Sequence, residues 1–111
     1  MSDDPMVSRF EAMLEQGTDN PMLRLTLGTA YWKSGNLDLS IEHLEQAVSQ
    51  KSDYSAAYKI LGRAYMDAGR LQEATGAFEN GLKSAADNGD KQSEKEINVF
   101  MKRLKKLQED T

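Results

Sequence analysis

The feature that most constrains the fold of this chain is a repeat with a period of 34 residues. Identical residues recur at that offset, and the pairs are Leu27 and Leu61, Gly28 and Gly62, Ala30 and Ala64, Tyr31 and Tyr65, Gly35 and Gly69, Leu37 and Leu71, Glu45 and Glu79, and Asp53 and Asp87. Large apolar residues recur with them, since Leu44 corresponds to Phe78 and Val48 to Leu82. A period of this length with this content predicts a solenoid of helix-turn-helix units.

The repeated positions resemble the signature of the tetratricopeptide repeat (TPR) family. That signature runs from an aromatic residue through Leu-Gly, a small residue and Tyr to a Gly in the turn, and then to Ala and an aromatic residue in a second helix. The second copy carries it at Tyr58, Leu61, Gly62, Ala64, Tyr65, Gly69, Ala74 and Phe78. The first copy departs from it at Arg24, where an aromatic residue is expected, and at Ser40, where alanine is usual. The resemblance implies an all-α, right-handed superhelical solenoid of about six helices.

The repeat also predicts how the chain is divided. One step of the period backwards aligns Phe10 with Leu44, so the first helix resembles the second helix of a unit whose first helix is missing. One step forwards fails, because Lys95 and Glu96 take the places of Leu-Gly. We therefore expect a single TPR domain with an N-terminal half repeat, two whole repeats and a C-terminal capping helix. The predicted bounds are 1–111 for the domain and 5–20, 21–54, 55–88 and 89–111 for its four parts.

Local signals predict where the helices begin and end. Asp4-Pro5 and Asn20-Pro21 each combine a capping side chain with proline at the first helical position. Helix ends are predicted at Gly17, Gly35, Gly69 and an Asp87-Asn88-Gly89 turn. The last helix, about 91–109, has an apolar stripe of Ile97, Phe100, Met101, Leu104 and Leu107. Gly28 and Gly62 fall inside helices, where glycine costs about 1 kcal/mol relative to alanine, so we expect a neighbouring helix to pack closely at both.

The residue types present argue against catalysis. The chain has no cysteine and one histidine, His43, so it lacks the residues for a catalytic triad or for a site of cysteine and histidine metal ligands. We expect His43 to be structural, either solvated or half-buried. The glycines are isolated and recur with the repeat, so no phosphate-binding loop is expected. We therefore expect no enzyme activity, no cofactor, no metal and no small-molecule substrate.

Charge and hydropathy narrow the partners further. The net charge of −4 argues against nonspecific binding of nucleic acid, which needs a clustered basic surface. With 29% charged and 39% hydrophobic residues the chain is too polar for a membrane protein. No long apolar run follows the acidic start, so we expect no secretory signal. Together with the lack of cysteine, this favours a cytoplasmic location.

The resemblance implies where a partner binds. In the TPR family the first helices of successive units line a concave face that holds an extended peptide or a helix. The residues of these helices outside the core stripe are Met22, Leu25, Thr29, Trp32, Lys33, Lys59, Arg63 and Met66. Trp, Met and Arg are enriched at the centres of protein interfaces, so we expect an apolar partner residue near Trp32 and a partner carboxylate on Lys59 and Arg63. A complete carboxylate clamp, which some TPR proteins use, is not expected, because only Lys59 falls on a clamp-like position.

Two other interpretations stay open at the level of the sequence. In one, Trp32 and Met66 belong to the core under a terminal helix that folds back, and the patch binds no partner. In the other, the chain is a self-assembly unit that homo-oligomerises through its helical ends, because the first helix leaves an apolar edge that another copy could cover. The first twenty residues are acidic, whereas the last helix carries Lys102, Arg103, Lys105 and Lys106. An RNA-associated role rests on these last residues alone.

Overall fold

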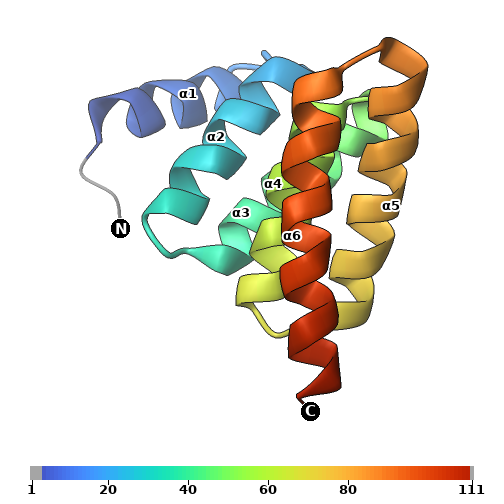
Figure 1. Cartoon of the computed structure of the whole chain (residues 1–111). Coiled ribbons are helices and arrows are strands. Elements are labelled where there is room, and N and C mark those ends of the chain that lie inside the picture. Colours follow the sequence, from blue (N-terminus) through green and yellow to red (C-terminus); the bar gives the residue numbers. More distant parts are fainter. Residues whose placement is uncertain (1–3, 111) are drawn as a thin grey trace.

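The structure, a computed structural model, describes residues 4–110 and shows six α-helices in this part of the chain (Figure 1). They are α1 (Pro5–Glu15), α2 (Pro21–Lys33), α3 (Leu37–Gln50), α4 (Ser55–Asp67), α5 (Leu71–Asn88) and α6 (Lys91–Glu109). No strand is present between residues 4 and 110. The prediction of an all-α fold with about six helices is confirmed.

Helix ends follow the capping signals of the sequence. Asp4 Oδ1 accepts a hydrogen bond from the backbone N–H of Met6 at 2.9 Å, and Asn20 Oδ1 accepts one from the backbone N–H of Leu23 at 2.9 Å. Proline occupies the start of both helices, where the missing N–H costs nothing. After α2 the chain turns at Gly35, whose φ of 82° is in the left-handed region that glycine adopts without strain.

Helix α5 is longer than the sequence signals predicted. Asp87 and Asn88 were expected to form a turn with Gly89, but both stay helical, and only Gly89 leaves the helix, with a φ of 67°. As a result α5 has 18 residues, whereas α3 has 14. Helix α6 starts 36 residues after α4, and at this offset Ile97 takes the position of Leu61. A step of 34 residues therefore finds no third copy, even though a helix is present.

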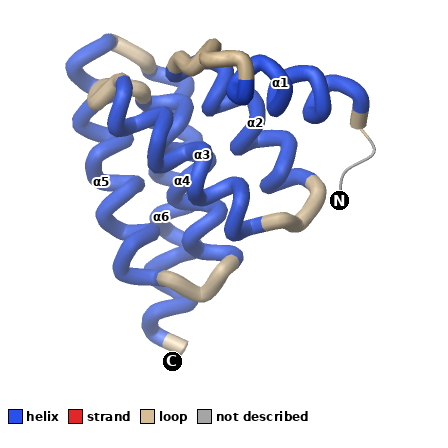
Figure 2. The backbone as a smooth tube through the Cα atoms, turned by 180° about the vertical axis from the view of Figure 1, so that it is seen from behind, coloured by secondary structure: helices blue, strands red, loops and turns tan. Residues whose placement is uncertain are grey.

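The helices form two layers of a solenoid. Helices α2, α4 and α6 lie side by side, and each helix also packs against the next one along the chain. Helices α1, α3 and α5 belong to the second layer, with α1 and α5 at opposite ends of the molecule (Figures 1 and 2). Helix α6 packs on α4 and α5 as α4 packs on α2 and α3. The layer of α2, α4 and α6 is thus the layer of first helices, where the sequence predicted the binding face.

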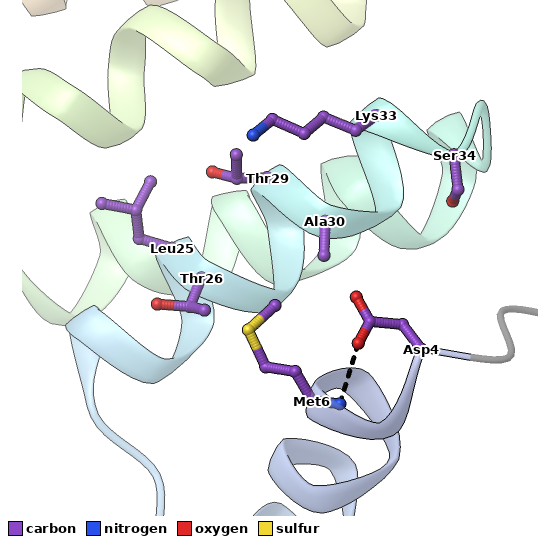
Figure 3. Close-up of a pocket in the computed structure, with 8 residues that line it drawn as sticks. All are labelled: Asp4, Met6, Leu25, Thr26, Thr29, Ala30, Lys33 and Ser34. Atoms are coloured by element: carbon purple, nitrogen blue, oxygen red, sulfur yellow. Dashed lines mark hydrogen bonds between the residues drawn. The ribbon is translucent and has the colours of Figure 1, made fainter.

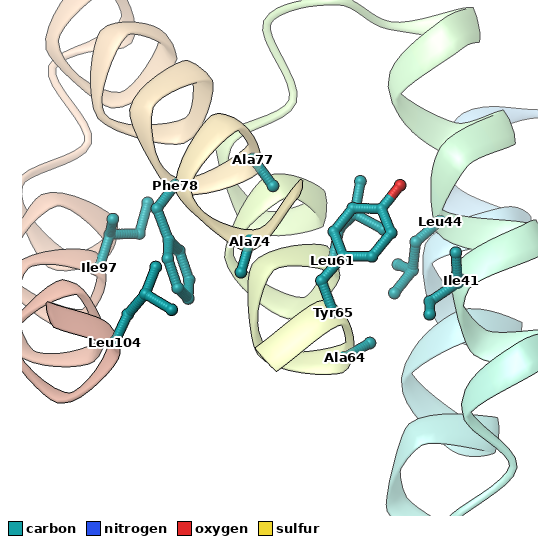
Figure 4. Close-up of a cluster of buried hydrophobic side chains, with 10 residues drawn as sticks. All are labelled: Ile41, Leu44, Leu61, Ala64, Tyr65, Ala74, Ala77, Phe78, Ile97 and Leu104. Atoms are coloured by element: carbon teal, nitrogen blue, oxygen red, sulfur yellow. The ribbon is translucent and has the colours of Figure 1, made fainter. Parts of the chain in front are cut away.

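The core has two parts. The main cluster runs from α3 to α6 (Figure 4) and contains Ile41, Leu44, Leu61, Ala64, Tyr65, Ala74, Ala77, Phe78, Ile97 and Leu104. A smaller cluster joins α1 to α2 through Val7, Leu23, Leu27 and Tyr31. Helix α1 therefore rests on a separate and smaller apolar contact than the helices that follow it.

Close packing at the two helix-interior glycines is confirmed. Gly28 lies against Leu44 of the next helix, and Gly62 lies against Phe78 in the same way. Ser40 is fully buried, and its hydroxyl donates a hydrogen bond to the carbonyl oxygen of Gly28 at 2.7 Å. This contact gives the serine that departs from the repeat signature a structural role.

Candidate functional site

The residues predicted to form a groove all lie on the neighbouring helices α2 and α4. Met22, at the start of α2, is 69% exposed, whereas Met66 is half-buried and packs against the main core. The other six fall into two groups. The first group lines a pocket beside α1 and consists of Leu25, Thr29 and Lys33. The second group is in contact with α6, directly or through a neighbour, and consists of Trp32, Lys59 and Arg63.

Arg63 connects three helices through two aromatic rings. Its guanidinium carbon lies 4.1 Å from the centroid of the Trp32 ring of α2 and 4.3 Å from that of the Phe100 ring of α6. Cation–π contacts of this kind contribute about 0.5–2 kcal/mol each. Trp32 Nε1 also donates a hydrogen bond to Asp67 Oδ2 at 2.9 Å, which fixes the indole ring from the other side of the contact. The guanidinium therefore has a defined position on the surface of the first helices.

The hydrogen-bonding capacity of Arg63 is unused within the described chain. Desolvation lowers the pKa of Arg63, the nearby charge of Asp67 raises it, and Arg103 lowers it again. Since the ordinary value is 12.5, the group keeps its charge at neutral pH. Arg63 forms no salt bridge or hydrogen bond with any residue from 4 to 110, and its polar atoms are not sealed from solvent. Its N–H donors are thus held in place and available to an acceptor from outside.

Lys59, by contrast, is already paired within the chain. Its Nζ lies 2.8 Å from Glu96 Oε2 of α6. The hydrogen bond from Lys59, followed by one from Gln92, lowers the pKa of Glu96. The two cations that the sequence placed together thus have different roles, because Lys59 holds α6 and Arg63 faces solvent with unpaired donors. Trp32 itself is half-buried, and α6 reaches it through Arg63.

A pocket of about 630 Å³ opens between α1 and α2 (Figure 3). Its lining consists of Asp4, Met6, Leu25, Thr26, Thr29, Ala30, Lys33 and Ser34. Figure 3 shows the side chain of Met6 reaching from α1 towards α2, while Lys33 lies along the far side. The pocket has an apolar floor and charged groups at its edge, so it suits an apolar side chain or the face of a helix.

His43 lies in a buried polar network and not in the solvated or half-buried setting that was expected. It is 5% exposed. Arg24 donates to Nδ1 at 3.0 Å, so the proton of the neutral ring is on Nε2, which lies 3.1 Å from Glu11 Oε1. The ring stacks on Tyr31 at a centroid distance of 5.5 Å. These partners satisfy the ring, and Glu11 links the network to α1, so the histidine can be buried without an unpaired polar atom.

Arg24, the other departure from the repeat signature, belongs to the same network. Besides its contact with His43 it forms a two-bond pair with Asp19, at 2.9 Å for each bond. This pairing, together with a hydrogen bond from Gln50, lowers the pKa of Asp19 to about 2. An aromatic residue at position 24 could not hold Asp19 or orient the histidine, so the arginine has a role in joining α1, α2 and α3.

Two further searches of the described residues gave negative results. No group of three or more His, Asp or Glu side chains between residues 4 and 110 is arranged to hold a metal ion. None of the helices in the same range is both long and apolar enough to cross a membrane.

The sequence missed the contribution of α6 to this surface. Glu96, Phe100 and Arg103 all lie next to the predicted residues, and Arg103 adds a second cation 5.6 Å from the Phe100 ring centroid. An alignment of α6 with α4 at an offset of 36 residues would have placed Phe100 beside the first-helix surface. A search at a constant period of 34 could not find it.

Comparisons with known proteins agree with this geometry. The sequence model of the family described as Tetratricopeptide repeat matches residues 25–90. The chain is 46% identical over 99 residues to the TPR repeat-containing protein PA0015 of Pseudomonas aeruginosa, which covers 89% of this chain and 94% of that protein. Among solved structures it is similar to protein BPP2914 of Bordetella parapertussis, with a TM-score of 0.80, 40% identity and coverage of 94% and 90%. It is also similar to the first TPR of Spaghetti (RPAP3) bound to the HSP90 peptide SRMEEVD, with a TM-score of 0.71, 19% identity and coverage of 92% and 89%.

Proposed function

Because the chain belongs to the tetratricopeptide-repeat family, we propose that it is a non-catalytic module that binds a segment of a partner protein on the surface of α2, α4 and α6. The observation that carries this proposal is Arg63, which is fixed by Trp32 and Phe100 while its N–H donors have no partner among residues 4–110. A cation that is positioned in advance loses little conformational entropy when it pairs with an acceptor. The surface therefore suits a segment that brings a carboxylate to Arg63.

The same surface also offers apolar contacts for such a segment. Trp32 lies next to Arg63, and Leu25 and Thr29 continue the face of α2 towards the pocket beside α1. A partner segment with an acidic residue and an apolar residue nearby would pair the first with Arg63 and pack the second against Trp32 or Leu25. Hydrogen bonds between a guanidinium and a carboxylate are about twice as strong as neutral ones, so Arg63 would supply much of the specificity.

The structural neighbour Spaghetti supports an acidic segment as the first probe. That protein was solved with the peptide SRMEEVD, which contains three acidic residues. At 19% identity the likeness shows a shared fold alone, and this chain presents a guanidinium held by two rings. We therefore propose an acidic and apolar segment as the class of ligand and do not carry over a particular partner. A cytoplasmic location, favoured by the composition, stays part of the proposal.

A selection from random peptides tests the proposal. Wild-type protein should enrich peptides that contain acidic and apolar residues, whereas Arg63→Gln and Trp32→Ala should lose this enrichment with helix content unchanged by circular dichroism. Arg70→Gln is the matched control, because Arg70 contacts the ring of Tyr65 at 4.8 Å and pairs with Glu73 away from Trp32. Equal enrichment by wild type and Arg63→Gln, or no enrichment by wild type, would contradict the proposed function.

A further inference from the structure

Helix α1 packs as a second helix without a first. Glu11 of α1 accepts a hydrogen bond from the Tyr31 hydroxyl of α2 at 3.2 Å, and Glu45 of α3 accepts one from the Tyr65 hydroxyl of α4. Each contact joins a second helix to the first helix of the following unit, and the two contacts are one repeat of 34 residues apart. Helix α1 therefore has the place of a second helix, and no first helix precedes it among the described residues.

The side of α1 that would face a first helix is apolar and uncovered. Met6 and Phe10 correspond to Ser40 and Leu44, both of which are fully buried where α3 meets its own first helix. Met6 is instead 37% exposed and Phe10 is half-buried. The pocket of about 630 Å³ between α1 and α2 lies on this side and includes Met6. This end of the solenoid thus has an open position for one helix.

The α2 side of the same pocket leads to the same conclusion. Thr29 and Lys33 line the pocket, and one repeat later they correspond to Arg63 and Asp67 of α4. Those two residues are the ones that the preceding first helix contacts, through Trp32. The pocket is therefore at the position where a preceding first helix would pack on α2.

Helix α6 has the opposite arrangement, because it packs as a first helix without a second. At the offset of 36 residues Asn98 corresponds to Gly62, which lies against Phe78 of its own second helix α5. On α6 this side is open and forms one wall of a groove of about 660 Å³ along α5. The groove is lined by Thr75, Leu82, Asn98, Met101, Lys102, Leu104, Lys105 and Gln108. Its apolar floor and its two lysines suit an amphipathic helix that carries negative charge.

Helix α1 and its following turn have that character. Residues 4–19 contain four acidic residues and one basic residue, whereas α6 contains six basic and three acidic residues. The segment that lacks a first helix is thus negatively charged, and the segment that lacks a second helix is positively charged. Complementary charge speeds the encounter of two surfaces and fixes their orientation.

We infer that the groove between α5 and α6 is the docking site for α1 of a second copy of this chain. Helix α6 of one copy and α1 of the next then complete one helix-turn-helix unit, and α6 enters the α1–α2 pocket. The contact is heterologous, so each added copy leaves an open position at either end and assemblies lengthen with concentration. This goes beyond the proposed function, because the docking groove contains neither Trp32 nor Arg63. Thr29 and Lys33 are shared with the predicted partner surface, so a second copy and a partner segment compete for α2.

One residue limits how closely the two copies approach. Asn98 stands where both repeats have a glycine that lies against a large side chain of the second helix. Its side chain keeps an incoming α1 further away than α3 is from α2, so the contact between copies is weaker than the contact within one chain. We expect Asn98→Gly to lower the concentration of half-association about tenfold, which corresponds to about 1.4 kcal/mol.

Sedimentation velocity of the whole chain over a range of concentrations up to about 1 mM tests the inference. The average mass of the wild type should rise with concentration, and Lys102→Glu with Lys105→Glu should keep the protein monomeric. The matched control is Lys91→Glu with Lys95→Glu, which changes the same charge on the same helix at exposed positions outside the groove and should leave association intact. Met6→Lys should also block association, whereas Met22→Lys, at a 69% exposed position outside the pocket, should not.

A mixing experiment separates this arrangement from a symmetric dimer. The groove variant, Lys102→Glu with Lys105→Glu, keeps an intact α1, and Met6→Lys keeps an intact groove. An equimolar mixture should therefore form a one-to-one dimer that does not grow. A wild type that stays monomeric throughout, a mixture that stays monomeric, or a control pair that loses association equally would each overturn the inference. Helix content by circular dichroism shows that every variant is folded, and none of them changes the residues that test the proposed partner surface.

Discussion

Gly28 of α2 lies so close to Leu44 of α3 that a Cβ atom on the glycine would stand 2.5 Å from Leu44 Cγ. Gly62 has the same relationship to Phe78 one repeat later. Real Cβ atoms essentially never come this close to a carbon atom of a neighbouring helix, so the two helices of each unit can pack at their present distance only if glycine is present. The cost of glycine inside a helix, about 1 kcal/mol, is offset by this contact.

The first prediction follows from these contacts. Gly28→Ala and Gly62→Ala should lower the free energy of unfolding by about 1–3 kcal/mol, because overpacking outweighs the gain in helix propensity. Gly76→Ala, inside α5 with no atom within 4 Å of its Cβ position, is the control and should raise stability by up to about 1 kcal/mol. Urea unfolding measures all three. A gain in stability for Gly28→Ala would show that the packing does not require glycine.

The second prediction uses Trp32, the only tryptophan in the sequence. Arg63→Gln and Phe100→Leu remove one component each of the stack, so acrylamide should quench Trp32 fluorescence more strongly in both variants. The loss of a cation–π contact should also lower the free energy of unfolding by about 0.5–2 kcal/mol. Arg70→Gln removes a cation from a different ring, that of Tyr65, and should leave the quenching of Trp32 unchanged. Unchanged quenching in Arg63→Gln would contradict the stacked arrangement in solution.

The third prediction concerns pH. Burial lowers the pKa of His43 below its ordinary value of 6.5, an effect that Glu11 and Glu42 oppose and Arg24 reinforces. Because the folded state favours the neutral ring, the contribution of His43 to stability is complete above 6.5 and is lost as the pH falls towards the lowered pKa.

We therefore expect the stability difference between wild type and His43→Gln to be largest at about pH 7.5 and to shrink by about pH 5. Urea unfolding at the two pH values measures it, and the comparison cancels the carboxylates that both proteins share. The sequence has no other histidine, so a change near pH 6 reports on this network. A difference that does not vary with pH would show that the ring titrates alike in both states.

The fourth prediction concerns the role of α6 in the core. Ile97 is fully buried, so Ile97→Ala should cost about 2–5 kcal/mol. Val99, two residues away on the same helix, is 51% exposed, and Val99→Ala should stay within about 0.5 kcal/mol of wild type. Deletion of residues 91–111 removes the cover of α5 altogether and should cause aggregation. A truncated chain that is monomeric and melts cooperatively would contradict this.

The features that the sequence predicted well depend on near neighbours. The helix starts at Asp4 and Asn20 need only a capping oxygen two or three residues from its donor, and the packing at Gly28 and Gly62 follows from the repeat itself. The position of α6 could not be predicted, because it depends on how many turns α5 makes before Gly89. For the same reason the sequence placed Lys59 and Arg63 together as partner-binding cations, although only the contacts of α6 distinguish them.

The four additional residues of α5 have a wider consequence for how such proteins are counted. One turn of helix corresponds to about 5.4 Å, so the lengthened α5 shifts the start of α6 along its axis without changing which helices are neighbours. The family model accordingly ends at residue 90, just before a helix that packs as a further member of the array. Insertions of a whole helical turn are thus silent in three dimensions and conspicuous in sequence. Surveys that count units by period alone will underestimate the size of arrays built in this way.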